Sequence, residues 1–107
     1  MINLVKNDVG STIEATITDS QGNAKSLDNL TCYLHVRKIG SSSAIYSLTG
    51  NITDSANGIV NFVFDDGKLD VVPGTYQSEI ELVGIGGNRE TVFDYIDITI
   101  RDEIAWF

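Results

Sequence analysis

Apolar and polar residues alternate along several short stretches of this chain, and this period of two limits the fold more than any other feature of the sequence. The clearest example runs from Leu30 to Arg37, where every second residue is apolar. Successive side chains of a β-strand point to opposite faces of its sheet, so this pattern predicts a strand with one buried face and one solvated face.

The same alternation recurs along the rest of the chain, in segments separated by turn clusters rich in Gly, Asn, Asp and Ser. It predicts strands over residues 12–18, 44–49, 60–65, 76–82 and 91–101, after an opening strand at 2–5. No segment has a helical period, and at most a single helical turn is expected at 26–28 or 67–69. About seven short strands with regular turns predict an all-β fold, an immunoglobulin-like antiparallel β-sandwich.

The length of 107 residues corresponds to one domain, which we expect to span residues 1–107. Cys32 is the single cysteine of the sequence, so the domain is expected to fold without an internal disulfide. The last residues, 101–107, change in character from charged to aromatic. They could pack against the domain or link it to a further domain or partner, and the sequence leaves both alternatives open.

The formal net charge of −8 limits the partners that this chain can bind. Nucleic-acid binding depends on Lys and Arg neutralising phosphates, so nucleic acid is not expected as a partner, and an anionic membrane is disfavoured for the same reason. No apolar run reaches the ~18 residues of a membrane span, and residues 1–8 lack the features of a signal peptide. We therefore expect synthesis in the cytoplasm.

The residue types that usually carry catalysis are few and scattered. His35 lies on the polar face of its predicted strand, and no motif places a nucleophile or an orienting carboxylate beside it. Cys32 falls on the apolar face of the same strand, where we expect a buried, unreactive thiol. Glu79 and Glu81 share one strand face, where paired acids usually serve solvation. We therefore predict that the chain is not an enzyme.

Two loops resemble ligand-binding motifs but lack essential positions. Asp65–Asp70 resembles a calcium loop, yet Gly67 stands at its third position, where an oxygen ligand is required, and Tyr76 stands at its twelfth, where a glutamate is required. Gly84–Gly87 is rich in glycine, but a strand is predicted after it, whereas a dinucleotide-binding loop precedes a helix. Both segments are interpreted as turns, and no metal or cofactor is predicted.

The segment Pro73–Ser78 has the pattern of a tyrosine corner, in which a tyrosine at the start of a strand binds back to the preceding backbone. Tyr76 would be that tyrosine. Antibody-type domains carry a cysteine two residues later, where this chain has Ser78, and they carry a core tryptophan, whereas the single tryptophan here is Trp106. The predicted sandwich is therefore immunoglobulin-like without being an antibody-type domain.

Taken in order, several segments of the chain resemble the N-terminal immunoglobulin-like domain of phage baseplate upper proteins. These segments are Lys6–Gly10, Ile13–Asp19, Leu30–Arg37, Gly58–Phe64, Pro73–Glu81 and Glu90–Phe93. Asp94 stands where that family leads us to expect a proline. The resemblance implies a virion structural part, made in the host cytoplasm and assembled into the baseplate or tail, with no catalytic residues.

On this resemblance, we expect a module that docks within a baseplate or tail fibre through contacts with other phage structural proteins and supports host adsorption. Because such assemblies are symmetric, a homo-oligomer is expected. The candidate contact residues are apolar and aromatic anchors: Ile2, Leu4, Ile104, Trp106 and Phe107. The alternative is a carbohydrate-binding or adhesin-like β-sandwich domain, which would use exposed aromatic residues such as Tyr33 and Tyr46.

Overall fold

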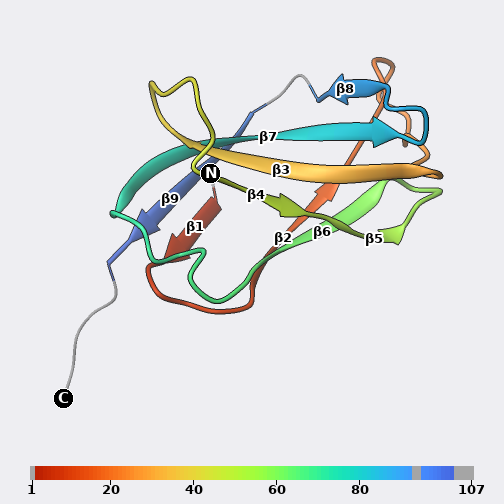
Figure 1. Cartoon of the computed structure of the whole chain (residues 1–107). Helices are drawn as coiled ribbons and strands as arrows, with labels where there is room; N and C mark the ends of the chain where they lie inside the picture. Colours follow the sequence, from red (N-terminus) through yellow and green to blue (C-terminus); the bar gives the residue numbers. More distant parts are fainter. Residues whose placement is uncertain (1, 93–94, 103–107) are drawn as a thin grey trace.

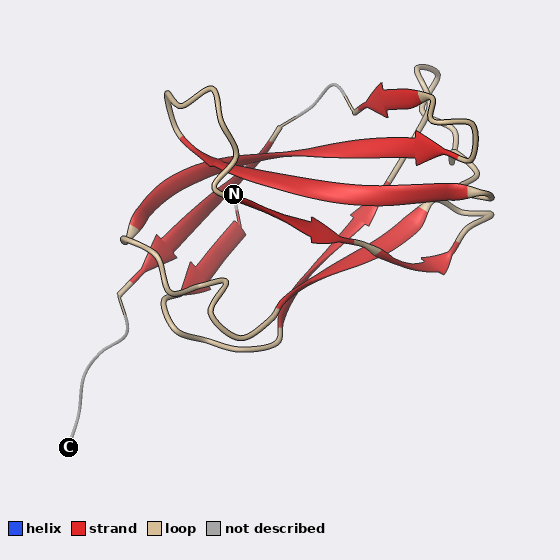
Figure 2. Ribbon diagram, in the orientation of Figure 1, coloured by secondary structure: helices blue, strands red, loops and turns tan. Residues whose placement is uncertain are grey.

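The computed structural model describes residues 2–92 and 95–102, and within them the chain forms nine β-strands and no helix (Figures 1 and 2). Most strands coincide with the alternating segments of the sequence. Their bounds are β1 Ile2–Val5, β2 Ser11–Thr16, β3 Leu30–Lys38, β4 Tyr46–Thr49, β5 Asn51–Asp54, β6 Ile59–Phe64, β7 Gly74–Gly84, β8 Arg89–Thr91 and β9 Ile96–Arg101. The all-β prediction is therefore confirmed.

The larger of the two sheets has the strand order β1-β9-β7-β3-β4, and the short strand β8 pairs with the far end of β7. The central pair is β3 and β7, whose antiparallel register extends from Leu30 opposite Gly84 to Lys38 opposite Tyr76. These two strands are the longest of the described part, and they carry most of the residues discussed below. They lie side by side across the upper part of Figure 1.

The smaller sheet has the strand order β2-β6-β5. The chain passes from the larger sheet to the smaller one at Gly50, between β4 and β5, where the Gly50 N–H donates to the Cys32 carbonyl at 2.7 Å. A Cβ atom at Gly50 would lie 2.6 Å from Val60 Cγ2 and 2.8 Å from a ring carbon of Phe62. The crossing therefore requires a residue without a side chain.

The inner faces of the two sheets enclose the apolar core, as expected for a sandwich-like arrangement. The apolar positions of the alternating strands supply it, and they are almost fully removed from water. The core residues of β3, β6, β7 and β9 are Cys32, Leu34, Val36, Val60, Phe62, Phe64, Tyr76, Ile80, Leu82, Ile98 and Ile100. Leu27 and Leu69 reach the same core from loops, so loop residues also contribute to it.

Two expectations need correction. The larger sheet is mixed and not purely antiparallel, because β1 pairs in parallel with β9, whereas the smaller sheet is antiparallel. The alternating pattern of a strand does not encode the direction of its partner, and β1 joins the edge of the sheet without a hairpin. Within the described residues there are nine strands and not about seven, since the short strands β5 and β8 had no clear signal. The segments near 26–28 and 67–69 contain turns and no helix, in agreement with the expectation of at most a single helical turn.

The tyrosine corner is present. The Tyr76 hydroxyl donates a hydrogen bond to the backbone carbonyl of Val72, and the Tyr76 side chain is almost fully buried at the start of β7. Next along the inner face, the Ser78 hydroxyl donates to the carbonyl of Ile96 at 2.9 Å. A buried hydroxyl therefore connects β7 to β9 two residues after the tyrosine of the corner.

Candidate functional site

The outer face of the larger sheet gathers the polar and aromatic residues of β3 and β7. Because β3 and β7 pair in antiparallel register, Tyr33 lies opposite Glu81, His35 opposite Glu79 and Arg37 opposite Gln77. All of these side chains point away from the core, since they alternate with buried residues along each strand. We refer to Tyr33, His35, Arg37, Gln77, Glu81 and Tyr95 as the outer-face patch.

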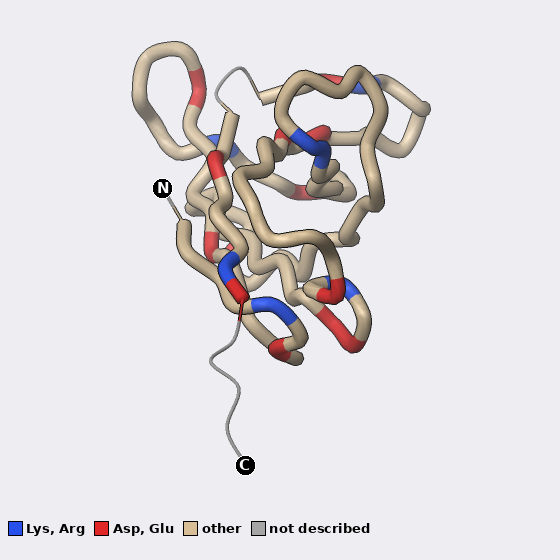
Figure 3. Tube along the Cα trace, turned by 90° about the vertical axis from the view of Figure 1, so that its left-hand side faces the viewer, with Lys and Arg blue, Asp and Glu red and all other residues tan. Residues whose placement is uncertain are grey.

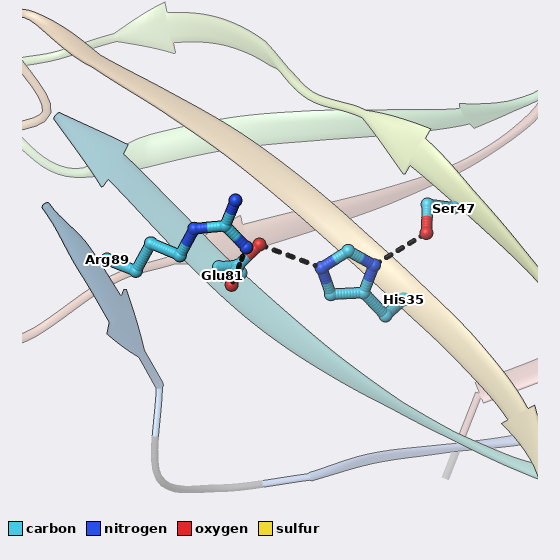
Figure 4. A network of polar contacts seen from close by, with 4 residues as sticks. All are labelled: His35, Ser47, Glu81 and Arg89. Carbon is cyan, nitrogen blue, oxygen red and sulfur yellow. Dashed lines mark hydrogen bonds and ion pairs between the residues drawn. The ribbon is translucent and has the colours of Figure 1, made fainter. Parts of the chain in front are cut away.

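His35 is the centre of a hydrogen-bonded network on this face (Figure 4). Its Nδ1 atom lies 2.5 Å from the Ser47 hydroxyl, and its Nε2 atom lies 3.1 Å from Glu81 Oε1. The other carboxylate oxygen of Glu81 is 3.6 Å from Nη1 of Arg89 on β8. A carboxylate can only accept, so Nε2 carries a proton and donates to Glu81, and in the neutral ring Nδ1 accepts from Ser47.

The network combines the residue types of a hydrolase triad, and its surroundings decide what it can do. A triad needs oxyanion-hole donors and a site that excludes water around the nucleophile. Ser47 is exposed on β4 and lines neither of the two hollows described below. Glu81 and His35 are half-buried and hold each other in place. The arrangement is therefore best suited to fixing the orientation of the His35 ring on the sheet surface.

The rest of the outer-face patch is ordered in the same way. The rings of Tyr33 and His35 stack with centroids 6.2 Å apart. The Arg37 guanidinium donates to Gln77 Oε1 at 2.9 Å and lies 5.0 Å from the ring centroid of Tyr95. Between these residues is a hollow of about 70 Å³. Small-molecule sites typically have volumes of ~300–1,000 Å³, so this hollow is too small to hold a small-molecule ligand.

A second and larger hollow lies between the two sheets, along the free side of β2. Its volume is about 790 Å³, and we refer to it as the intersheet groove. Its apolar lining comes from both sheets: Ile2, Ile13, Ala15, Ile17, Ile80, Leu82, Val92 and Ile96. Its polar rim includes Glu14, Asp19, Lys25 and Glu90.

The structure places two of the five predicted contact residues, and both lie on β1. Leu4 is 9% exposed and belongs to the core, so its side chain offers little surface to a partner. Ile2 is half-buried and lines the intersheet groove. Ile104, Trp106 and Phe107 lie outside the described residues, as does most of the tail at 101–107. The contact role of all five residues stays a prediction.

Other candidate residues are placed as follows. Cys32 is fully buried in the core, as expected, and burial raises the pKa of its thiol. Glu79 and Glu81 do share the outer face of β7. Tyr46, expected to be an exposed aromatic, faces inward instead and meets Phe64 edge to face at 6.4 Å between ring centroids. Within the described residues, no three His, Cys, Asp or Glu side chains are grouped so that they could hold a metal ion.

The sequence interpretation missed the partner of His35. It treated the ring as an isolated solvent-facing side chain, whereas Glu81 reaches it from a strand that lies 46 residues away in the chain. The signal was available in principle, because the two clearest alternating segments, at 30–37 and 76–82, are natural neighbours in one sheet. What the alternation could not supply was the register, which decides that His35 and Glu81 meet.

Comparisons with known proteins identify no relative. No protein-family profile matches the sequence, and no curated protein shows significant similarity to it. The candidate site therefore rests on the geometry of the outer face and the groove.

In the part of the chain that the structure describes, no helix is long and apolar enough to cross a membrane.

Proposed function

We propose that this chain is an immunoglobulin-like module of a phage virion, which docks within the baseplate or tail fibre apparatus through protein–protein contacts. The strand order supports the immunoglobulin-like fold. An immunoglobulin-like sandwich pairs strands B, E and D in one sheet and G, F, C and C′ in the other. The orders β2-β6-β5 and β9-β7-β3-β4 correspond to these two sheets, and Tyr76 provides the corner at the start of the F-equivalent strand β7.

The outer-face patch supports the proposal that the module docks through protein–protein contacts. Tyr and Arg are the residue types most enriched at the energetic centres of protein interfaces, and an ordered side chain loses little entropy on binding. Tyr33, His35 and Arg37 are each held by a neighbour on the sheet before any partner arrives. A face whose side chains are ordered in this way, without a hollow large enough for a small molecule, suits the surface of another folded protein.

The proposal is tested by the complete chain and the products of its neighbouring genes, co-expressed and analysed by size-exclusion chromatography with light scattering. We expect a stable complex that Arg37→Glu weakens strongly. Lys38→Glu is the matched control, because it makes the same charge change one residue further along β3, outside the patch. Equal loss with both variants, or no complex with any neighbouring product, would contradict the proposal.

The same measurement tests the tail and the proposed oligomer. We expect the complete chain to form a homo-oligomer within the assembly, with Ile104, Trp106 and Phe107 among its contacts. A chain truncated after Arg101 should then assemble less well than the full chain. Unchanged assembly after truncation would remove the tail from the contact surface and would leave the outer-face patch as the docking site.

A carbohydrate-binding domain is the second candidate, and the aromatic residues of the outer face favour it. Sugars stack on exposed rings, and Tyr33 and Tyr95 lie on the same face, with Tyr95 52% exposed. Tyr46 cannot serve in this role, because it faces the core. Binding of the isolated chain to a glycan array, lost in Tyr95→Ala and retained in Lys38→Glu, would favour this function over purely structural docking.

A further inference from the structure

The intersheet groove is a separate surface from the outer-face patch. Its lining residues on β7, Ile80 and Leu82, alternate with the outward-facing Glu79 and Glu81. The groove and the patch therefore lie on opposite sides of the larger sheet. A substitution in one need not disturb the other, so their functions can be tested independently.

The groove exposes apolar surface that the sandwich itself does not cover. Ile2, Ala15, Val92 and Ile96 line it and are only partly buried, although they pack against the core. Its volume of about 790 Å³ lies within the range of ~300–1,000 Å³ typical of ligand sites. Side chains of a partner could therefore enter between the sheets and remove this apolar surface from water.

One wall of the groove is also a free sheet edge. Within the described residues β2 pairs with β6 on one side and with no strand along the other. The N–H of Ile17 donates to the Gly58 carbonyl at 2.8 Å, so by alternation Ile13 and Ala15 also face β6. The backbone groups of Thr12, Glu14 and Thr16 then point to the open side. An unpaired edge of this kind is a template for an additional strand.

The rim of the groove is predominantly acidic. Glu14 and Asp19 lie on the side of β2, and Glu90 lies on the side of β8. Lys25 bridges the two sides, because its Nζ lies 3.4 Å from Glu90 Oε2, so these two charges offset each other and Glu14 and Asp19 leave the rim negative. The whole chain has 15 acidic and 7 basic residues, and Figure 3 shows the acidic positions spread along the trace. A segment that enters the groove is therefore favoured by positive charge.

We propose that the intersheet groove binds one extended strand of a partner protein, with apolar side chains at alternate positions and Lys or Arg at its ends. The strand would pair with the free edge of β2, and every second side chain would enter the groove. The chain's own tail is a poorer occupant, because Asp102 and Glu103 precede its apolar residues and would meet the acids of the rim.

The experiment uses the complete chain and two synthetic peptides. Both have Val or Ile alternating with Thr, and they differ in carrying Lys or Glu at their ends. We expect the Lys peptide to bind with an affinity at least about tenfold higher than that of the Glu peptide. Glu14→Lys should reverse that preference. Asp97→Lys is the matched control, since Asp97 is exposed on β9 outside the groove lining, and it should leave the preference unchanged.

Two further measurements separate binding in the groove from damage to the fold. Ala15→Leu adds apolar volume inside the groove, so it should weaken peptide binding while the thermal stability is kept or increased. Bound peptide should slow hydrogen exchange at the amides of Thr12, Glu14 and Thr16. Equal binding of both peptides, or protection elsewhere with these amides unaffected, would overturn the proposal. Self-association through the groove without peptide would also overturn it, because a second copy would then be the occupant.

Discussion

The hydroxyl of Tyr76 donates its hydrogen bond to the carbonyl of Val72, a residue four positions earlier in the chain. Tyr76 is 3% exposed, whereas Val72 is 63% exposed. The bond therefore ties an outer loop to the buried start of β7. It fixes the point at which the chain, after leaving β6 in the smaller sheet, enters the centre of the larger one.

Tyr76→Phe removes this bond and keeps the buried ring. We expect the free energy of unfolding to fall by about 1 kcal/mol, which is the net contribution of a typical hydrogen bond whose released acceptor can reach water. Urea denaturation followed by circular dichroism measures the change. An unchanged midpoint and slope would show that the corner does not contribute to stability.

Tyr46→Phe is the matched comparison, with the opposite expectation. In the described part of the chain the Tyr46 hydroxyl is buried and has no hydrogen-bond partner. Removing it abolishes a desolvated polar group and leaves the edge-to-face contact with Phe64 in place. Stability at neutral pH should stay constant or rise by up to about 1 kcal/mol. A loss as large as that of Tyr76→Phe would indicate a partner for this hydroxyl.

Tyr46 also makes the alkaline stability of the domain dependent on pH. Burial, with a smaller contribution from Tyr76, raises the pKa of Tyr46 from 10.0 to about 12. Because the folded-state pKa exceeds the unfolded one, ionisation of Tyr46 leaves the free energy of unfolding unchanged below about pH 10. It lowers that free energy as the pH rises from there to about 12. Urea denaturation series across that pH range should show a smaller fall in the free energy of unfolding for Tyr46→Phe than for the unsubstituted chain. Identical slopes for both proteins would contradict the expectation.

Gly58 should be the least replaceable glycine of the turns. Its φ is +71°, and a Cβ atom there would lie 2.5 Å from the Ile17 carbonyl oxygen and 2.8 Å from that of Lys25. Both contacts are with backbone, which cannot rotate away. Gly58→Ala should therefore lower the free energy of unfolding by about 2 kcal/mol or more.

Gly86→Ala is the control for this prediction. A Cβ atom at Gly86 meets nothing within 4 Å, and Gly86 is not among the positive-φ glycines. The two variants should therefore differ clearly in thermal midpoint. Similar midpoints would mean that the β6 turn relaxes around the added methyl group.

The sequence predicted the buried faces of the strands well because alternation reports directly on which side chains face the core. It failed for β5, in which Ile52 is the single apolar residue, and for β8, whose three residues are all polar and exposed, so neither strand presents an alternating pattern. Pairing direction and register are also invisible to alternation. For that reason the parallel pairing of β1 with β9 was not predicted, and neither was the contact between His35 and Glu81.

The candidate surfaces were harder to predict than the strands for the same reason. The outer-face patch depends on the register between β3 and β7, and the groove depends on how far apart the two sheets lie along β2. Neither the register of two strands nor the separation of two sheets is encoded in the alternation of a single strand. Ile2 was predicted as a contact from its apolar character, and its position in the groove lining emerged from the pairing of β1 with β9.

Cys32 provides the last prediction, because the sequence and the structure place it in the same environment. Its side chain is fully buried on the inner face of β3, and burial raises the pKa of the thiol from 9.0, so the reactive thiolate is disfavoured in the folded state. The native chain should therefore react with a disulfide reagent such as DTNB far more slowly than the chain in denaturing urea. Across a urea series, the labelling rate should follow the unfolded fraction.

Two substitutions of Cys32 distinguish the loss of packing in the core from the cost of burying a polar group. Cys32→Ala leaves a small cavity, whereas Cys32→Ser places a hydroxyl in the apolar core, at an expected cost of about 1–3 kcal/mol if it finds no partner. Serine should therefore destabilise the fold more than alanine, although serine is closer to cysteine in size. Rapid labelling of the native chain would show that the centre of β3 opens to water without global unfolding. Equal stability of the two variants would show that the serine hydroxyl finds a hydrogen-bond partner in the core.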